Sequence, residues 1–293
     1  MVSRLDLWKQ HAGVDLQAMF PAGARDPDKI KGWTYQAFLE GCKKLHAAGH
    51  PFGNPVSDWS DSPMWLAPLL LGFGSQLMTP DGGIAVNSDG TRAALEFLKE
   101  LTAYMPEDVY EWDNASNNRW IIEGKGSAIY NPPSAWAVAK EEAPEVAAQL
   151  WHHDAPAGSS GRYRGAQPVF FGIWTFAANK PAAKDLLLYL CQQDQVFKIV
   201  RGSQGFDTPL QAAFSDHEVW QKEGPPVGTL YNYPVHGDEV QVVPGYPAPP
   251  HIAGKIADAH LIANLVVKVT RDGQSTGEAI AWAEGELEKI AKT

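Results

Sequence analysis

The sequence predicts an α/β protein with two lobes. Segments with apolar residues at helical spacing alternate along the chain with short apolar or alternating runs that are typical of strands. The 293 residues are more than one average domain needs, which favours a second lobe. The 27 glycines and 22 prolines indicate many ordered loops between the elements.

The first third of the chain predicts mainly helices, each with recognisable start or stop residues. The expected elements are, in order, a helix over residues 5–11, a helix from the cap Thr34 to Gly49, a buried helix over 64–73, a hairpin around 79–83, and an amphipathic helix from Ser88 to Pro106.

The rest of the chain organises around residues 119–136. A helix that stops at 124–126 leads into a buried strand over 127–130, and Asn131-Pro132-Pro133 ends strand pairing because proline has no amide donor. Ser134 is placed to cap a helix whose first turn carries Trp136. An indole beside free backbone amides suits the rim of a cleft, so Trp136 is predicted to be a ligand platform; the alternative is a tryptophan that fills the core.

The second half predicts a strand followed by helices. The expected elements are a strand over 169–178, a helix that begins at Lys180-Pro181 and runs to Cys191, a helix over 193–200, a proline-rich crossover over 224–250, and two long helices over 252–270 and 276–291.

Charge and composition exclude several classes of protein. The formal charge of −10, without a basic stripe, disfavours nucleic-acid binding. No run reaches the ~20 apolar residues that a membrane helix needs. The sequence begins without a secretory signal, as mature secreted chains also do.

Motifs for catalysis and metal binding are missing from the sequence. It contains no G-x-S-x-G, no Walker lysine loop and no H-E-x-x-H, so we expect no catalytic residue, no metal and no cofactor. Cys42 and Cys191 are far apart, and either a disulfide or two inert buried thiols is compatible with the sequence. Asp58 and Asp61 suit charge-assisted bonds to sugar hydroxyls; the alternatives are solvated loop charges or a glycosidase pair.

The 11 tryptophans are the most informative feature of the composition. Apolar faces beside polar edges match a pyranose, which shows a C–H face and a rim of hydroxyls, although aromatic side chains can also form a cage for a cation. Several tryptophans lie in or beside loops that carry Asp, Asn, Ser or Gln: Trp59, Trp65, Trp112, Trp120, Trp136 and Trp174.

Short motifs in a specific order resemble the bacterial extracellular solute-binding proteins of carbohydrate ABC importers, the maltose-binding-like type. The segment Gly32-Trp33-Thr34-Tyr35-Gln36-Ala37-Phe38 looks like the family's W-T-x-x-E-F helix start. The segment Ile122-Glu123-Gly124-Lys125-Gly126-Ser127-Ala128-Ile129 resembles its F-x-x-G-K-A-A-M strand entry. Further similar segments are 5–8, 12–15, 69–78, 81–83, 93–98, 179–183 and 276–280. The likeness covers nearly the whole chain, although Ser75 replaces a glycine common in the family.

The resemblance implies a periplasmic-binding-protein type II fold and a periplasmic protein that hands a sugar or polyol to ABC permease subunits in the membrane. Trp136 falls where many members place a stacking aromatic. Together with the aromatic and polar loop residues, this gives the expected ligand-binding residues: Trp136, Asn131, Trp59, Asp58, Asp61, Trp65 and Trp174. The alternatives are a carbohydrate-active enzyme that uses loop carboxylates, and a binder of phosphorylated polyols or cationic solutes.

The resemblance also implies a division into lobes. Residues 1–168 and 235–293 correspond to the second lobe, and residues 169–234 to a part of the first. Family members carry further first-lobe strands before the segment that matches Leu5, so we expect a shortened form with weak ligand binding, in which residues 169–178 are an unpaired strand.

Overall fold

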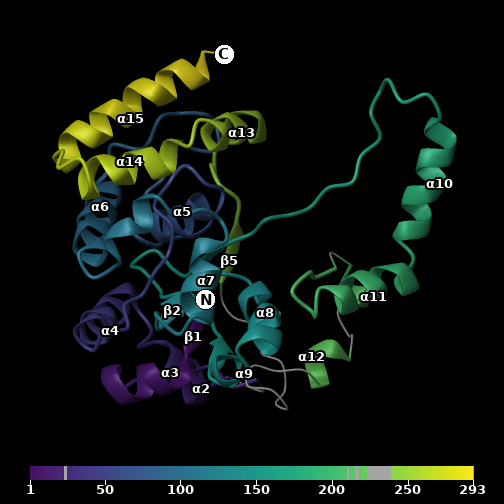
Figure 1. Ribbon diagram of the computed structural model, residues 1–293. Coiled ribbons are helices and arrows are strands. Elements are labelled where there is room, and N and C mark those ends of the chain that lie inside the picture. The colour runs from purple at the N-terminus through teal and green to yellow at the C-terminus, as the bar shows by residue number, and fades with distance from the viewer. Residues whose placement is uncertain (23–24, 210, 215–217, 223–238, 293) are drawn as a thin grey trace.

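The computed structural model describes residues 1–22, 25–209, 211–214, 218–222 and 239–292. Residues 1–168 and 239–292 make up the body of the molecule, and residues 169–192, called the arm below, extend away from it (Figure 1). The last helix, α15 (Thr276–Ala291), covers one end of the body together with α13 (Pro250–Asp258) and α14 (Leu261–Thr270).

A small antiparallel sheet lies in the body. Its central strand β1 (Val2–Arg4) pairs with β2 (Ala128–Ile129) on one side and β3 (Leu150–His152) on the other. A second sheet pairs β4 (Tyr163–Gly165) with β5 (Val240–Val242) in parallel. Strands from distant parts of the sequence therefore hold the body together.

Helices begin where the sequence supplies caps. The Thr34 hydroxyl accepts a hydrogen bond from the amide of Ala37 at the start of α4 (Tyr35–Ala47), and Ser88 does the same for α6 (Asp89–Thr102). Ser275 and Glu278 form a capping box on α15. The other helices within residues 1–150 are α1 (Leu5–Leu7), a π-helical turn (Trp8–Ala12), α2 (Leu16–Met19), α3 (Pro27–Ile30), α5 (Asp61–Gly72), a 3₁₀ turn (Glu107–Tyr110), α7 (Ser116–Ile122), α8 (Ser134–Glu142) and α9 (Pro144–Ala147).

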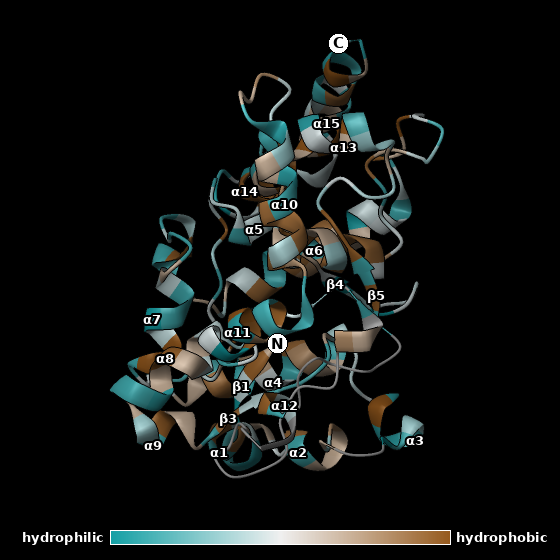
Figure 2. Ribbon diagram, turned by 90° about the vertical axis from the view of Figure 1, so that its right-hand side faces the viewer, coloured by the Kyte–Doolittle hydropathy of each residue, from teal (hydrophilic) through white to brown (hydrophobic). Residues whose placement is uncertain are grey.

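Two apolar cores support the body. The larger contains Trp8, Trp33, Leu66 and Leu265, and therefore joins the first helices to the last ones. The smaller lies around Trp136 and includes residues of α11 (Gln193–Gly202) and α12 (Val219–Lys222). Figure 2 shows apolar residues, in brown, interspersed with polar residues along the helices. A further 3₁₀ turn spans Ala212–Phe214.

Helix α5 and strand β4 approach each other closely. An added Cβ at Gly165 would lie 2.1 Å from the carbonyl oxygen of Met64, so only glycine fits between the two backbones. This contact fixes the position of the segment that follows β4.

The strand predicted over residues 169–178 is wrong. No strand forms there among the described residues, and the side chains of Phe170 and Phe176 are 82% and 80% exposed. A strand needs partners for its backbone amides and carbonyls, and the described chain offers none to this segment. The helix that follows, α10 (Lys180–Leu190), begins as predicted but has no buried residue.

Two further expectations need correction. The helix predicted over 252–270 is two helices, because His260 adopts the left-handed conformation with φ of 49° and breaks the run between α13 and α14. Cys42 and Cys191 are both free thiols, but only Cys42 is buried, whereas Cys191 is exposed at the end of α10. Most of the predicted crossover, residues 223–238, lies outside the described residues.

Candidate functional site

Polar side chains from the starts of three helices meet at one place on the body. Asp61 opens α5, Asn117 and Asn118 lie in the first turn of α7, and Asn131 with Ser134 precedes or opens α8. These five residues are called the polar cluster below. The bonds between them show that the cluster is a single connected unit.

Asn117 is the centre of the polar cluster and is fully buried. Its side-chain amide donates to the Asp61 carboxylate at 3.4 Å and to the side-chain oxygen of Asn131 at 3.5 Å. The amide nitrogen of Asn131 donates in turn to the side-chain oxygen of Asn118, and to the Ser134 hydroxyl at 3.2 Å. Two predicted site residues, Asp61 and Asn131, are therefore brought together through a third residue that was not predicted.

Burial raises the pKa of the Asp61 carboxyl above its ordinary value. The hydrogen bond from Asn117 opposes this shift, and the negative charge of Asp113 adds to it. Because burial disfavours the charged form of Asp61, a further hydrogen-bond donor, such as a ligand hydroxyl, would stabilise its carboxylate.

Two loops are tied together beside the polar cluster. The Ser57 hydroxyl donates to the carbonyl of Trp112 at 2.6 Å. Asn114 accepts from the Asp61 amide at 3.2 Å and donates to the Ser60 hydroxyl at 2.8 Å. These bonds fix the loop that carries Asp58 and Trp59, two further predicted site residues.

Asp58 and Trp59 are both exposed on that loop, and the Trp59 side chain is 52% exposed. Trp59 lies two residues before Asp61, a residue of the polar cluster, in the sequence. Among the predicted tryptophans it is the one that combines exposure with this neighbourhood.

The structure contradicts Trp136 and Trp65 as stacking platforms. Trp136 is completely buried in the smaller core with Ile121 and Leu150, and the ammonium of Lys140 lies 4.8 Å from the centre of its ring. Trp65 is 3% exposed and its indole donates to the carbonyl of Pro55. Both indoles are buried, so neither offers an open face to a ligand in this structure, and this burial favours the core interpretation of Trp136.

Trp174 is exposed, but it lies in the arm (residues 169–192) and not in the polar cluster. Its ring stacks on Phe176 with centres 5.4 Å apart. Its predicted role in binding stays a prediction.

The sequence interpretation missed Asn117 and Asn118. Their signal is the run Asp113-Asn114-Ala115-Ser116-Asn117-Asn118, which places polar side chains directly before the apolar part of α7. The asparagine side chain competes for backbone hydrogen bonds, which disfavours it inside helices and favours it at their starts. Such a run therefore indicates a polar helix start.

Two kinds of feature are missing from the described residues: a cluster of metal-ligating side chains and a helix that could span a membrane. In that part of the chain, no group of three His, Cys, Asp or Glu side chains is placed to hold a metal ion. The described helices also include none that is both long and apolar enough to cross a membrane.

A family model described as "Bacterial extracellular solute-binding protein" matches residues 1–225. The match covers more than half of the sequence, and the chain belongs to this family. Proteins of this family bind solutes for transport, which confirms the prediction that the chain is not an enzyme. None of the curated proteins compared with the chain matches it.

Solved structures confirm the periplasmic-binding-protein type II fold. A sugar transporter from Arthrobacter chlorophenolicus A6 with bound laminaribiose is similar with a TM-score of 0.75 at 14% identity, and the match covers 99% of this chain and 68% of that one. Maltose-bound MalE3 of T. maritima gives 0.73 at 20% identity, with 99% and 69% covered. A solute-binding protein from Thermotoga lettingae TMO bound with alpha-D-tagatose gives 0.67 at 16% identity, with 99% and 69% covered.

Proposed function

We propose that this protein is the substrate-binding component of a carbohydrate ABC importer. It binds a sugar or polyol at the polar cluster, with Trp59 as an aromatic face, and delivers it in the periplasm to the permease subunits of the importer. The observation that carries this proposal is the connected set of Asp61, Asn117 and Asn131 at three helix starts.

The chemistry of the polar cluster suits hydroxyl groups. The Asp61 carboxylate accepts hydrogen bonds, whereas each asparagine side chain can both donate and accept. A sugar hydroxyl likewise donates and accepts, so one hydroxyl can satisfy a carboxylate and an amide together. The three solved neighbours hold laminaribiose, maltose and alpha-D-tagatose, which supports a carbohydrate ligand.

The charge of the site favours a neutral ligand over a phosphorylated one. The Asp61 carboxylate would repel a phosphate group at this place, and the chain as a whole carries a formal charge of −10. This favours an unmodified sugar or polyol among the predicted ligands.

We also propose the lobe assignment that the sequence suggested. Residues 1–168 and 235–293 form the second lobe, and residues 169–234 belong to the first. The exposed apolar side chains of the arm support this assignment, because strands of a first-lobe sheet would cover them. The match to about 68–69% of the neighbours' length is compatible with it.

Isothermal titration with laminaribiose, maltose, tagatose and a simple polyol tests the proposed function. Asp61→Asn keeps the size of the side chain and removes its charge, and we expect about a 10-fold or larger loss of affinity for the sugar that binds. Glu96→Gln makes the same chemical change on an exposed position of α6 and should leave the affinity unchanged.

Two results would overturn the proposal. One is that none of these neutral ligands binds while a phosphorylated or cationic solute does. The other is that Asp61→Asn and Glu96→Gln bind the sugar equally well, since the polar cluster would then take no part in recognition.

A further inference from the structure

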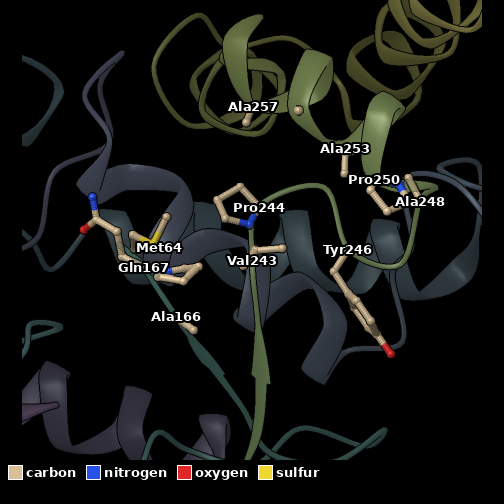
Figure 3. Close-up of a pocket in the computed structure, with 12 residues that line it drawn as sticks. Met64, Ala166, Gln167, Val243, Pro244, Tyr246, Ala248, Pro250, Ala253 and Ala257 are labelled. Atoms are coloured by element: carbon tan, nitrogen blue, oxygen red, sulfur yellow. The ribbon is translucent and has the colours of Figure 1, made fainter. Parts of the chain in front are cut away.

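A pocket of about 410 Å³ lies between α5, the segment after β4, the segment after β5, and α13 (Figure 3). Its walls include Met64 from α5, Pro168 after β4, Val243 and Tyr246 after β5, and Ala253 and Gly254 from α13. The volume lies in the range of small-molecule sites.

The lining of this pocket is almost entirely apolar. Gln167 provides the one side-chain amide among the residues that line it. The Tyr246 ring lies at the edge, with its hydroxyl pointing away from the pocket in Figure 3. A sugar placed here would lose hydrogen bonds to water without replacing them, whereas an apolar group would gain from leaving water.

The pocket is large enough for an aryl ring or a short alkyl chain. An apolar protein cavity of roughly 150 Å³ already accepts benzene. The pocket therefore has space for a ring and the bond that attaches it to a larger molecule.

The pocket lies next to the polar cluster because both use the first turn of α5. Met64 follows Asp61 by three residues, so the two side chains are on the same side of the helix and about 4.5 Å apart along its axis. A second link runs through Tyr130, which precedes Asn131: its hydroxyl accepts a hydrogen bond at 3.1 Å from the amide of Gly165, at the end of β4.

We propose that this pocket binds the apolar substituent of a glycoside whose sugar hydroxyls bind the polar cluster. The inference rests on the proposed function and narrows it, because it makes aryl or alkyl glycosides, and not unsubstituted sugars alone, the preferred ligands of this protein.

The test compares the phenyl and methyl glycosides of the sugar that binds most tightly. We expect the phenyl glycoside to bind at least about 10-fold more tightly, since a buried aromatic ring removes a large apolar area from water. Isothermal titration measures both affinities for the unmodified protein and for two variants.

Gly254→Leu adds a bulky apolar side chain at one wall of the pocket. A Cβ at Gly254 meets no atom within 4 Å, so the leucine side chain has space to grow from α13. Gly285→Leu is the matched control, since Gly285 in α15 is equally open and does not line the pocket. Both changes replace a helical glycine with a better helix former, so both variants should fold.

Gly254→Leu should abolish the preference for the phenyl glycoside and leave the methyl glycoside affinity unchanged, while Gly285→Leu should change neither. The inference is overturned, with the proposed function intact, if the methyl glycoside binds and the phenyl ring adds nothing. It is also overturned if Gly254→Leu weakens both glycosides equally. If no glycoside or sugar binds, the proposed function fails and the inference falls with it.

Discussion

Replacing Trp136 by alanine should destabilise the fold without acting on ligand recognition. Its side chain is completely buried among Ile121, Ala135, Leu150 and other residues of the smaller core. Removing a buried tryptophan costs about 3–5 kcal/mol of unfolding free energy, from lost burial and from the cavity left behind. The loss of the Lys140 ammonium over its ring adds about 0.5–1 kcal/mol.

Urea unfolding followed by circular dichroism measures this loss. With a slope of about 3 kcal/mol per molar urea, the midpoint should fall by more than about 1 M. Trp59→Ala is the matched comparison, because the Trp59 side chain is 52% exposed. That variant should keep the midpoint within about 0.3 M and lose about 10-fold in sugar affinity, as expected for one lost stacking face.

The opposite pattern would refute the reasoning. If Trp136→Ala unfolds at nearly the same urea concentration and loses its ligand, the indole is a platform, and the burial described above does not represent the binding state. If Trp59→Ala keeps full affinity, the aromatic face of the site lies elsewhere.

Two further predictions concern charge and exposed apolar surface. Burial, with the nearby Asp154 charge, raises the pKa of Glu239 from 4.5 to about 7. Between these pH values the folded state keeps a proton that the unfolded state releases. The unfolding free energy of the protein should therefore fall by up to about 3 kcal/mol as the pH rises from 4.5 to 7. In urea unfolding at pH 5 and pH 8, Glu239→Gln should gain stability relative to wild type at the higher pH. Replacing Phe170 and Phe176 together by serine should lower the fluorescence of a bound apolar dye and reduce self-association, because both rings are more than three-quarters exposed on the arm.

Each of these predictions has a clear contrary result. Equal pH dependence of wild type and Glu239→Gln would show that the carboxyl titrates normally in the fold. For the arm, Val138→Ser is the control, since Val138 is 41% exposed on the body. If it lowers dye fluorescence as much as the arm variant does, the arm is not the main apolar surface.

Local signals in the sequence predicted most helix starts and turns. The caps Thr34 and Ser88 work through contacts within a few residues, so their effect does not depend on the rest of the fold. The hairpin around residues 79–83 is likewise confirmed by a bridge between Met78 and Ile84. Such features are readable because both partners lie in the same short segment.

Features that depend on partners far away in the sequence could not be predicted from local patterns. The alternating pattern over 169–178 shows that the segment is apolar, but only a neighbouring strand can supply its hydrogen bonds. Trp136 and Trp59 look alike in sequence, beside prolines and polar residues, yet one is buried and the other exposed. The difference arises from what packs against each helix or loop, which no local pattern contains.

Helix α5 explains why the candidate site is rigid. Its residues from Trp65 to Gly72 are all buried, so the helix cannot shift without disturbing the larger core. Pro68 lies inside the helix and cannot donate to the carbonyl of Met64, which faces the glycine at the end of β4. The first turn of α5 is thereby packed against β4, and the spacing between Asp61 and Met64 is fixed. A ligand that uses both the polar cluster and the pocket must therefore fit a preformed distance between the Asp61 carboxylate and an apolar wall. Under the proposed function, this requirement would make the site select for glycosides of one length.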